Sequence, residues 1–252
     1  MLLALVRELL QPSLFLSEKS ILELYDIIKK TLTFVYMKII QTQDTNDAWR
    51  QTFCDLMNSE HETDNQKYYR DEPVLIRIEK PTFDQPEPLF PMLEDDLARI
   101  NRYIITGEEE DLVVHDWTKI YYHRTWDQPY SQIEFMIQGL QQGKPVGECQ
   151  ISMWDKNIDQ EADKSPCTQI LWARLKHGKL EWHTHAHSCD AYKKLLMNIR
   201  EFIALQHYVS QQIGVEVGTY YHFIDSCHIN WKDLEKCNQV QKLIEKEIYD
   251  IS

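Results

Sequence analysis

The second half of the chain carries the pattern that most limits how it can fold. Four segments there are rich in β-branched and aromatic residues and are typical of strands. They cover residues 147–154, 168–175, 179–188 and 215–230. A long amphipathic helix is expected over about residues 191–212, with Gly214 as its stop signal, and another over 232–249. Strands and helices in this order favour an α+β fold, a mixed sheet with flanking helices.

The first half of the chain is predicted to contain more helix than strand. Residues 1–60 are expected to be helical, with one helix beginning at Ser20 and another capped by Asn46 or Asp47. The next predicted elements are a strand over 74–78, a helix over 93–104, a strand over 112–126 and a helix from the Ser131 and Glu134 capping box to Gly143. With only 7 glycines, 9 prolines and no linker, we expect one domain over residues 1–252.

The acidic composition restricts the partners of the protein. Forty acidic against 27 basic side chains give a formal net charge of −13, which repels nucleic acid and anionic lipid unless a local basic patch exists. No basic run supplies one. The longest apolar stretches, residues 1–6 and 32–35, are far shorter than the ~18 residues of a membrane span. We therefore expect a soluble, cytoplasmic protein without nucleic-acid or membrane partners.

Three histidines alternate along the third predicted strand, at His183, His185 and His187. On a strand, all three project from one face together with Glu181. Such an arrangement can bind zinc and support hydrolysis, or it can form a polar strand face that lines a cleft. The absence of a second ligand pair at standard spacing and of an H-E-x-x-H motif favours the polar face.

Two isolated residues could carry chemistry. Cys167 follows Pro166 at the start of a predicted strand, and a nucleophilic role would require a nearby cation to favour the thiolate. A hairpin of the second and third strands would bring His187 near it. Asn198 lies beside the apolar stripe of the long helix, where its amide either bonds to local backbone or reads the edge of a base such as uracil.

These residues resemble the thymidylate synthase family, over about Tyr130 to Lys236. The matching motifs are Pro166-Cys167, His187-Ser188-Cys189-Asp190, Asn198 and His228-Ile229-Asn230. Asp190, Asn198 and His228 lie 23, 31 and 61 residues after Cys167, spacings that fit the family without a gap. The chain is similar to the shorter archaeal members and to the nucleotide hydroxymethylases. The resemblance implies the thymidylate synthase fold and a homodimer packed sheet to sheet.

The resemblance also implies roles for individual residues. Cys167 is the nucleophile that adds to C6 of a pyrimidine, so that C5 attacks the one-carbon unit of 5,10-methylenetetrahydrofolate. Asn198 reads the base edge, Ser188 bonds near the phosphate, Asp190 orders the base and its waters, and His228 meets a sugar hydroxyl. Cytosine-using hydroxymethylases of the family tend to carry Asp at the base-reading position, so Asn198 favours uracil.

Several positions depart from the family pattern. His187 replaces an arginine that would hold the 5′-phosphate, Lys144 lies where the family has a pair of arginines, and Asn230 replaces a tyrosine. The resemblance assigns the catalytic glutamate to Glu94. Phosphate would then be held by a rearranged set drawn from Lys144, Arg124, His185 and His187, or the substrate has no phosphate.

The leading hypothesis is a folate-dependent C5 methyl- or hydroxymethyltransferase acting on a uracil nucleotide or nucleoside. A CMP- or dCMP-type hydroxymethylase of modified-nucleotide or nucleoside-antibiotic synthesis is the nearest alternative. A pyrimidine-binding module without catalysis, or a zinc hydrolase built on the strand histidines, are alternatives of other classes.

Overall fold

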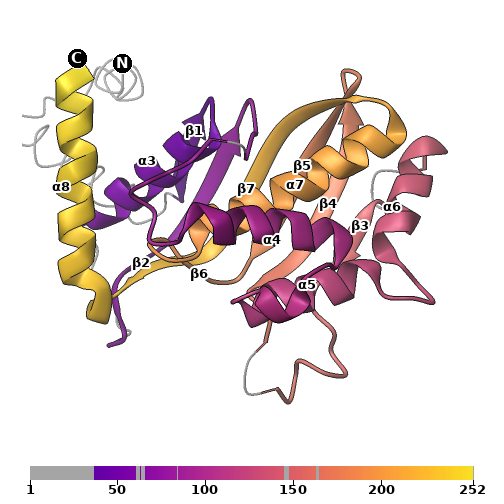
Figure 1. The fold of residues 1–252 in the computed structure, drawn as a ribbon, viewed down its shortest axis with the longest axis horizontal. Helices are drawn as coiled ribbons and strands as arrows, with labels where there is room; N and C mark the ends of the chain where they lie inside the picture. The colour runs from indigo at the N-terminus through magenta and orange to yellow at the C-terminus, as the bar shows by residue number, and fades with distance from the viewer. Residues whose placement is uncertain are drawn as a thin grey trace, which may run out of the picture. The chain divides into compact units, whose positions relative to one another are not determined.

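Seven strands form one mixed sheet in the part of the chain that the computed structural model describes, residues 37–60, 63, 66–83, 85–144, 148–162 and 165–251 (Figure 1). The strands are β1 (Lys38–Thr42), β2 (Tyr68–Ile78), β3 (Gln150–Ser152), β4 (Thr168–Lys176), β5 (Lys179–Ala186), β6 (Cys189–Asp190) and β7 (Glu216–Asn230). Their order is β1-β2-β7-β5-β4-β3, and β6 also pairs with β7. β2 runs antiparallel to β7, whereas β5 and β6 run parallel to it. The predicted mixed sheet is confirmed.

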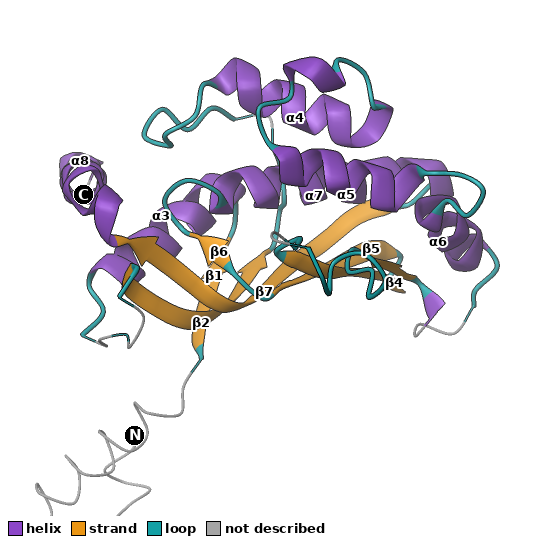
Figure 2. Ribbon diagram, turned by 90° about the horizontal axis from the view of Figure 1, so that it is seen from below, coloured by secondary structure: helices purple, strands orange, loops and turns teal. Residues whose placement is uncertain are grey.

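Six α-helices accompany this sheet in the described residues. They are α3 (Thr45–Met57), α4 (Glu94–Thr106), α5 (Asp116–Trp126), α6 (Gln132–Gln141), α7 (Leu195–Ile213) and α8 (Leu234–Ile251). Figure 2 shows α4, α5 and α7 on the same side of the sheet. None of the described helices combines the length and the apolar character needed to cross a membrane.

Helix α7 lies in the centre of the core, between the sheet and α4 (Figure 2). All residues from 195 to 206 are buried, including the polar ones. A helix covered on all sides must satisfy its polar groups internally. Gln206 does so by donating to the backbone carbonyls of Leu180, at 2.9 Å, and Gly218, at 3.0 Å. The buried polar side chains of α7 are therefore candidates for a functional role.

The predicted hairpin between β4 and β5 is confirmed. Its turn residues His177 and Gly178 have φ angles of 52° and 76°, the left-handed pair that a tight two-residue hairpin turn requires. The register pairs Thr168 with Ala186 at the far end. Cys167 therefore lies beside His187, whose backbone N–H donates to the Cys167 carbonyl at 2.9 Å.

The strand predicted over residues 112–126 is wrong, because this segment contains a short 3₁₀ turn (Glu110–Leu112) and helix α5. Its threonines and aromatic residues favour strands, but three of them are buried at helical spacing: Thr118, Tyr121 and Thr125. Packing of this face against the core overrides the local preference of the residues for extended structure.

Other boundaries also differ from the prediction. Residues 38–42 form strand β1, parallel to β2, within the first 60 residues that were expected to be helical. The cap of α3 is Asp44, whose carboxylate accepts the Asp47 N–H at 2.9 Å, and not Asn46 or Asp47. The strand predicted over 147–154 is limited to β3.

The described residues from Lys38 onward form one compact unit. The predicted helix that begins at Ser20 lies outside the described residues, so the expectation of a single domain over the whole chain stays a prediction. The other predicted helices are present as α3, α4, α6, α7 and α8, and Gly214 ends α7 in the left-handed conformation with φ of 72°.

Candidate functional site

A pocket of about 280 Å³ opens beside Cys167, where β4 begins. Seven residues of the motifs named from the sequence line it: Cys167, Ser188, Cys189, Asp190, Asn198, His228 and Asn230. Six residues that the sequence did not point to line it as well: Lys67, Tyr68, Trp117, Tyr121, Lys194 and Lys232. The fold thus brings residues from separate segments of the chain into one cavity.

The sheet explains why these segments meet. After a register shift between Leu180 and Trp182, β5 and then β6 pair with β7 in the same register. Cys189 therefore faces Cys227 and Asp190 faces His228. The chain then turns directly into α7, which places Asn198 over the same edge. The long strand β7 is therefore the scaffold of the pocket.

Cys167 is half-buried at this edge. Burial raises the pKa of its thiol, while the ammonium groups of Lys194 and Lys67 act in the opposite direction. The next residue, Thr168, donates its backbone N–H to the phenol oxygen of Tyr121 at 3.1 Å. Cys167 is held firmly, with two cations near enough to favour its thiolate.

The carboxylate of Asp190 is fixed by three hydrogen bonds. One oxygen accepts the backbone N–H groups of Tyr192, at 3.0 Å, and Lys193, at 2.9 Å. The other accepts from the side-chain amide of Asn230 at 2.8 Å. Asn230 therefore orients Asp190, an arrangement that suits a group whose direction must be set before a ligand binds.

Asn198 is buried, with 5% of its surface exposed. Its side-chain nitrogen donates to the sulfur of Cys189 at 3.7 Å, not to local backbone. Sulfur is a weak acceptor. Exchange of this bond for one to an oxygen or nitrogen of a ligand would stabilise the amide.

His228 lies between Tyr68 and Ser188. Its ring stacks on that of Tyr68 with centroids 3.9 Å apart, and its Nδ1 lies 3.2 Å from the Ser226 carbonyl and 3.5 Å from the Ser188 hydroxyl. Burial lowers the pKa of His228 in spite of the nearby Asp190. A carbonyl can only accept, so Nδ1 of the neutral ring carries the proton and Nε2 can accept from a ligand hydroxyl.

Lys194 supplies a cation at the start of α7. Its ammonium nitrogen contacts both ring nitrogens of His115, with Nε2 at 3.2 Å. Burial and the charge of Lys194 lower the pKa of His115 to about 4, so this ring is neutral near pH 7. Burial also lowers the pKa of Lys194, although Glu201, Asp190, Cys189 and Cys167 oppose that shift.

Three of the predicted site residues lie outside the pocket lining. Glu94 begins α4, and its two oxygens bind the guanidinium of the buried Arg200 at 2.5 and 3.1 Å. The Lys144 ammonium lies over the Phe135 ring, 4.4 Å from its centroid. The side chain of His187 is exposed.

The other two cations considered for phosphate are engaged elsewhere. The Arg124 guanidinium binds both carboxylate oxygens of Asp159 at 2.9 and 3.0 Å. His185 lies 3.0 Å from Asp225. The cations that line the pocket are lysines, and none of the positions considered from the sequence is among them.

Two of the histidines on β5 stack on aromatic rings of β7. His183 stacks on Tyr221 with centroids 4.6 Å apart, and His185 stacks on Phe223 at 5.0 Å. Across the described residues, no three His, Cys, Asp or Glu side chains are grouped so that they could hold a metal ion. The zinc-hydrolase alternative therefore lacks a ligand set in this part of the chain.

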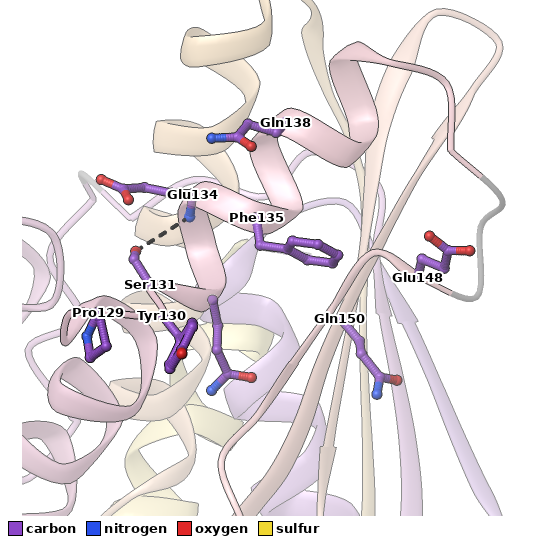
Figure 3. Close-up of a pocket in the computed structure, with 9 residues that line it drawn as sticks. Pro129, Tyr130, Ser131, Glu134, Phe135, Gln138, Glu148 and Gln150 are labelled. Carbon is purple, nitrogen blue, oxygen red and sulfur yellow. Dashed lines mark hydrogen bonds between the residues drawn. The ribbon is translucent and has the colours of Figure 1, made fainter.

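A larger hollow of about 680 Å³ lies beside α6 (Figure 3). Figure 3 shows Phe135 and Gln138 on α6 and Glu148 and Gln150 on the opposite wall. It shares no lining residue with the Cys167 pocket and contains no cysteine, histidine or lysine. The candidate chemistry therefore belongs to the smaller pocket.

Several residues of the pocket and its surroundings were not identified from the sequence. Tyr121 and Trp117 were hidden by the strand prediction for residues 112–126. Lys194, Asn198 and Glu201 recur at i, i+4 and i+7 along α7, a polar spacing that marks one helix face.

The chain resembles known proteins in sequence and in fold. A family model described as thymidylate synthase matches residues 101–252. A protein of Methanocaldococcus jannaschii, provisionally named a thymidylate synthase, is 26% identical over 166 residues, 62% of this chain and 72% of that protein. Another with the same provisional name, from Methanosarcina acetivorans, is 22% identical over 212 residues, 81% of this chain and 95% of that protein. Thermostable thymidylate synthase A from Bacillus subtilis shares the fold, with a TM-score of 0.62 at 15% identity over 79% of this chain and 84% of that one.

Proposed function

Because this chain belongs to the thymidylate synthase family, we propose that it transfers a one-carbon unit from 5,10-methylenetetrahydrofolate to C5 of a pyrimidine nucleotide or nucleoside. The observation that carries the proposal is the pocket that gathers Cys167, Ser188, Asp190, Asn198 and His228. They come from four separate motifs, and their convergence gives one cavity a nucleophile, a base-reading amide and groups for a sugar.

Cys167 performs the covalent step. Its thiolate adds to C6 of the base, forming the S–C6 bond and moving the C5–C6 π electron pair to C5. Bound methylenetetrahydrofolate would supply the one-carbon unit that becomes bonded to C5. The C5 proton and the folate nitrogen then leave, hydride or water adds to the exocyclic carbon, and the C5–C6 double bond re-forms as the S–C6 bond breaks to release the thiolate. Lys194 and Lys67 support the reaction by favouring the anionic sulfur.

Asn198 selects the base. A side-chain amide can donate to O4 and accept from N3–H of uracil with one planar group. Cytosine presents an acceptor at N3 and a donor at N4, so an aspartic acid suits it at that position, since its carboxyl accepts from N4 and, when protonated, donates to N3. Uracil is therefore the favoured base, and the cytosine-using hydroxymethylase is the less favoured alternative.

The sugar and its 5′ substituent would contact His228, Ser188 and the lysines of the pocket lining. Nε2 of His228 can accept a hydrogen bond from a sugar hydroxyl, and the Ser188 hydroxyl lies beside the His228 ring. Lys67, Lys194 and Lys232 supply positive charge along the lining, in place of the arginines of the family pattern. Ammonium groups attract phosphate as point charges without the forked geometry of a guanidinium.

The lining also fits a flat folate ring. Trp117 presents a half-buried aromatic side chain to the cavity, and stacking on such a face is how proteins hold planar heterocycles. When bound, the folate supplies the one-carbon unit. Trp117 would hold its ring, and Cys167 and Asn198 would hold the pyrimidine.

The test is loss of the C5 hydrogen. Purified protein is incubated with methylenetetrahydrofolate and with dUMP, UMP, dCMP, CMP or the free nucleosides, each tritiated at C5. We expect release from at least one uracil compound, abolished in Cys167→Ser and retained in Cys54→Ser, a matched change of a half-buried cysteine on α3. Absence of release from every compound would refute the proposal.

Two measurements refine the substrate and the product. Product mass separates methyl transfer, in which hydride captures the exocyclic carbon, from hydroxymethyl transfer, in which water does. The ratio of kcat/KM for dUMP and deoxyuridine reports whether the lysines recognise phosphate. We expect the nucleotide to be preferred, with a preference that falls as salt is added.

A pyrimidine-binding module without catalysis is the second candidate, because burial raises the pKa of the Cys167 thiol in the ligand-free protein. Intact mass after incubation with 5-fluoro-dUMP and methylenetetrahydrofolate distinguishes the two. A covalent adduct at Cys167 supports the enzyme. Saturable binding without an adduct supports the module.

We also propose a homodimer through the sheet face that carries the histidine stacks. Ile170 on this face is 38% exposed, and Trp172 packs on His183 with centroids 4.7 Å apart. A face of this apolar character favours association. Light scattering should give a dimer for the wild type and for Ile158→Glu, a control at a loop isoleucine that is 59% exposed. A monomer is expected for Ile170→Glu, and an unchanged dimer would exclude this face.

A further inference from the structure

Glu201 is a buried acidic residue that the proposed reaction does not use. It lies on α7 with 0% of its surface exposed. One carboxyl oxygen accepts from the Thr118 hydroxyl on α5 at 2.9 Å. The other oxygen has no hydrogen-bond partner among the described residues. A buried carboxylate would need more hydrogen bonds than this position provides. A protonated carboxyl carries no charge, so its burial costs less.

Four groups interact with Glu201. Lys194 is the N-cap of α7, Thr118 and Tyr121 lie on α5, and Tyr220 lies on β7. Burial raises the pKa of Glu201 to about 8, and the Thr118 hydrogen bond and the Lys194 charge only partly offset that effect. The carboxyl therefore carries its proton near pH 7.

The helix connects this carboxyl to the pocket. Lys194, Asn198 and Glu201 occupy i, i+4 and i+7 on one face of α7. Lys194 lines the pocket and is within electrostatic reach of both Glu201 and Cys167, while its ammonium contacts the ring of His115. Tyr121 is also within electrostatic reach of both Glu201 and Cys167. A change of charge at Glu201 therefore reaches the nucleophile through one intervening lysine.

We propose that Glu201 is a positioning residue of the Cys167 pocket, a buried carboxyl whose proton decides whether the charge of Lys194 is available to the Cys167 thiolate. While Glu201 is neutral, the ammonium of Lys194 stabilises the thiolate. When the O–H bond of Glu201 breaks and its proton leaves to solvent, the new carboxylate compensates the ammonium and the thiolate loses that support. The inference rests on the proposed nucleophilic role of Cys167.

The test follows the reactivity of Cys167 against pH. Iodoacetamide alkylation of Cys167, measured by peptide mass, reports the thiolate fraction without pyrimidine or folate. We expect Glu201→Gln to match the wild type near pH 6 and to react at least about threefold faster near pH 9, where only the wild type carries the carboxylate. Glu181→Gln is the matched control, a buried carboxyl on β5 outside the pocket lining, and should follow the wild type. Equal profiles for all three proteins would overturn the proposal.

A second variant keeps the proposal testable if Glu201→Gln does not fold. Thr118→Val removes the hydroxyl that favours the carboxylate while preserving the shape of the side chain. The pH at which the alkylation profile bends should then move upward. A bend that stays in place would count against the proposal. Protein that releases no C5 hydrogen from any pyrimidine but shows these profiles would refute the proposed function and leave this inference intact.

Discussion

Replacing Glu201 by glutamine is expected to remove a pH dependence from the free energy of unfolding. Burial raises the pKa of this carboxyl in the folded protein from 4.5 to about 8. A group with a raised folded pKa adds stability that is fully present below its unfolded pKa and is lost as the pH rises through its folded pKa. The wild type should therefore lose stability between about pH 4.5 and pH 8.

The size of the effect follows from the pKa shift. Each pH unit within that window changes the free energy of unfolding by about 1.4 kcal/mol for one proton. From about pH 5 to about pH 8 the loss is therefore of order 4 kcal/mol, a large part of the 5–15 kcal/mol typical of a folded domain. Glutamine has no such proton, so the variant should lack this loss.

The free energy of unfolding can be measured at several pH values by urea unfolding, followed by tryptophan fluorescence, for the wild type and for Glu201→Gln. The pKa of His115 is lowered to about 4 and that of His222 to about 3, chiefly by burial, so both destabilise the protein as the pH falls. They are present in both proteins and cancel in the difference between them. Parallel curves for the wild type and Glu201→Gln from about pH 5 to pH 8 would refute the assignment of a buried protonated carboxyl.

Three further changes test other contacts. Asn198→Asp should shift base preference toward cytosine by about tenfold or more, because a carboxylate accepts from N4 but cannot donate to O4; C5 release from mixed dUMP and dCMP checks this, and unchanged preference would contradict it. Asn230→Ala removes the 2.8 Å bond to Asp190 and should lower kcat about tenfold with little effect on stability; an unchanged kcat would exclude the orienting role. Gly218→Ala would place a Cβ atom 2.9 Å from the Leu180 carbonyl oxygen, and thermal unfolding should show a loss of about 1–3 kcal/mol.

The sequence predicts the elements whose signals are local. The β4–β5 hairpin is recognisable from its His177-Gly178 turn, since only a left-handed pair closes so short a connection. Ser131 predicts the start of α6 because its side chain alone satisfies the Glu134 N–H, at 3.4 Å. The spacing of the motifs also predicts that Cys167 and Asn198 lie in one pocket, because the spacing matches the thymidylate synthase family and this chain has the fold of that family.

Contacts between distant segments could not be predicted in the same way. Strand β1 has only five residues, and its pairing with β2 stabilises it more than its own composition does. Glu94 begins a helix next to a predicted site, but only the fold shows that the buried Arg200 binds it. An amphipathic pattern predicts that the polar side of α7 faces solvent, yet α4 covers that side.

The burial of α7 links these observations. Its polar side chains away from the pocket bond to oxygen, as Arg200 does with Glu94 and Gln206 with two backbone carbonyls. Asn198 lines the pocket and donates only to a sulfur, whereas Glu201 lies outside the pocket lining and has one unpaired oxygen. Arg200 and Gln206 also keep one side-chain atom each, Nε and Oε1, without a partner among the described residues. An unsatisfied buried polar group costs about 1–3 kcal/mol. Stability alone would favour an apolar residue at position 198, so its side-chain amide is best explained by a ligand that binds in the pocket.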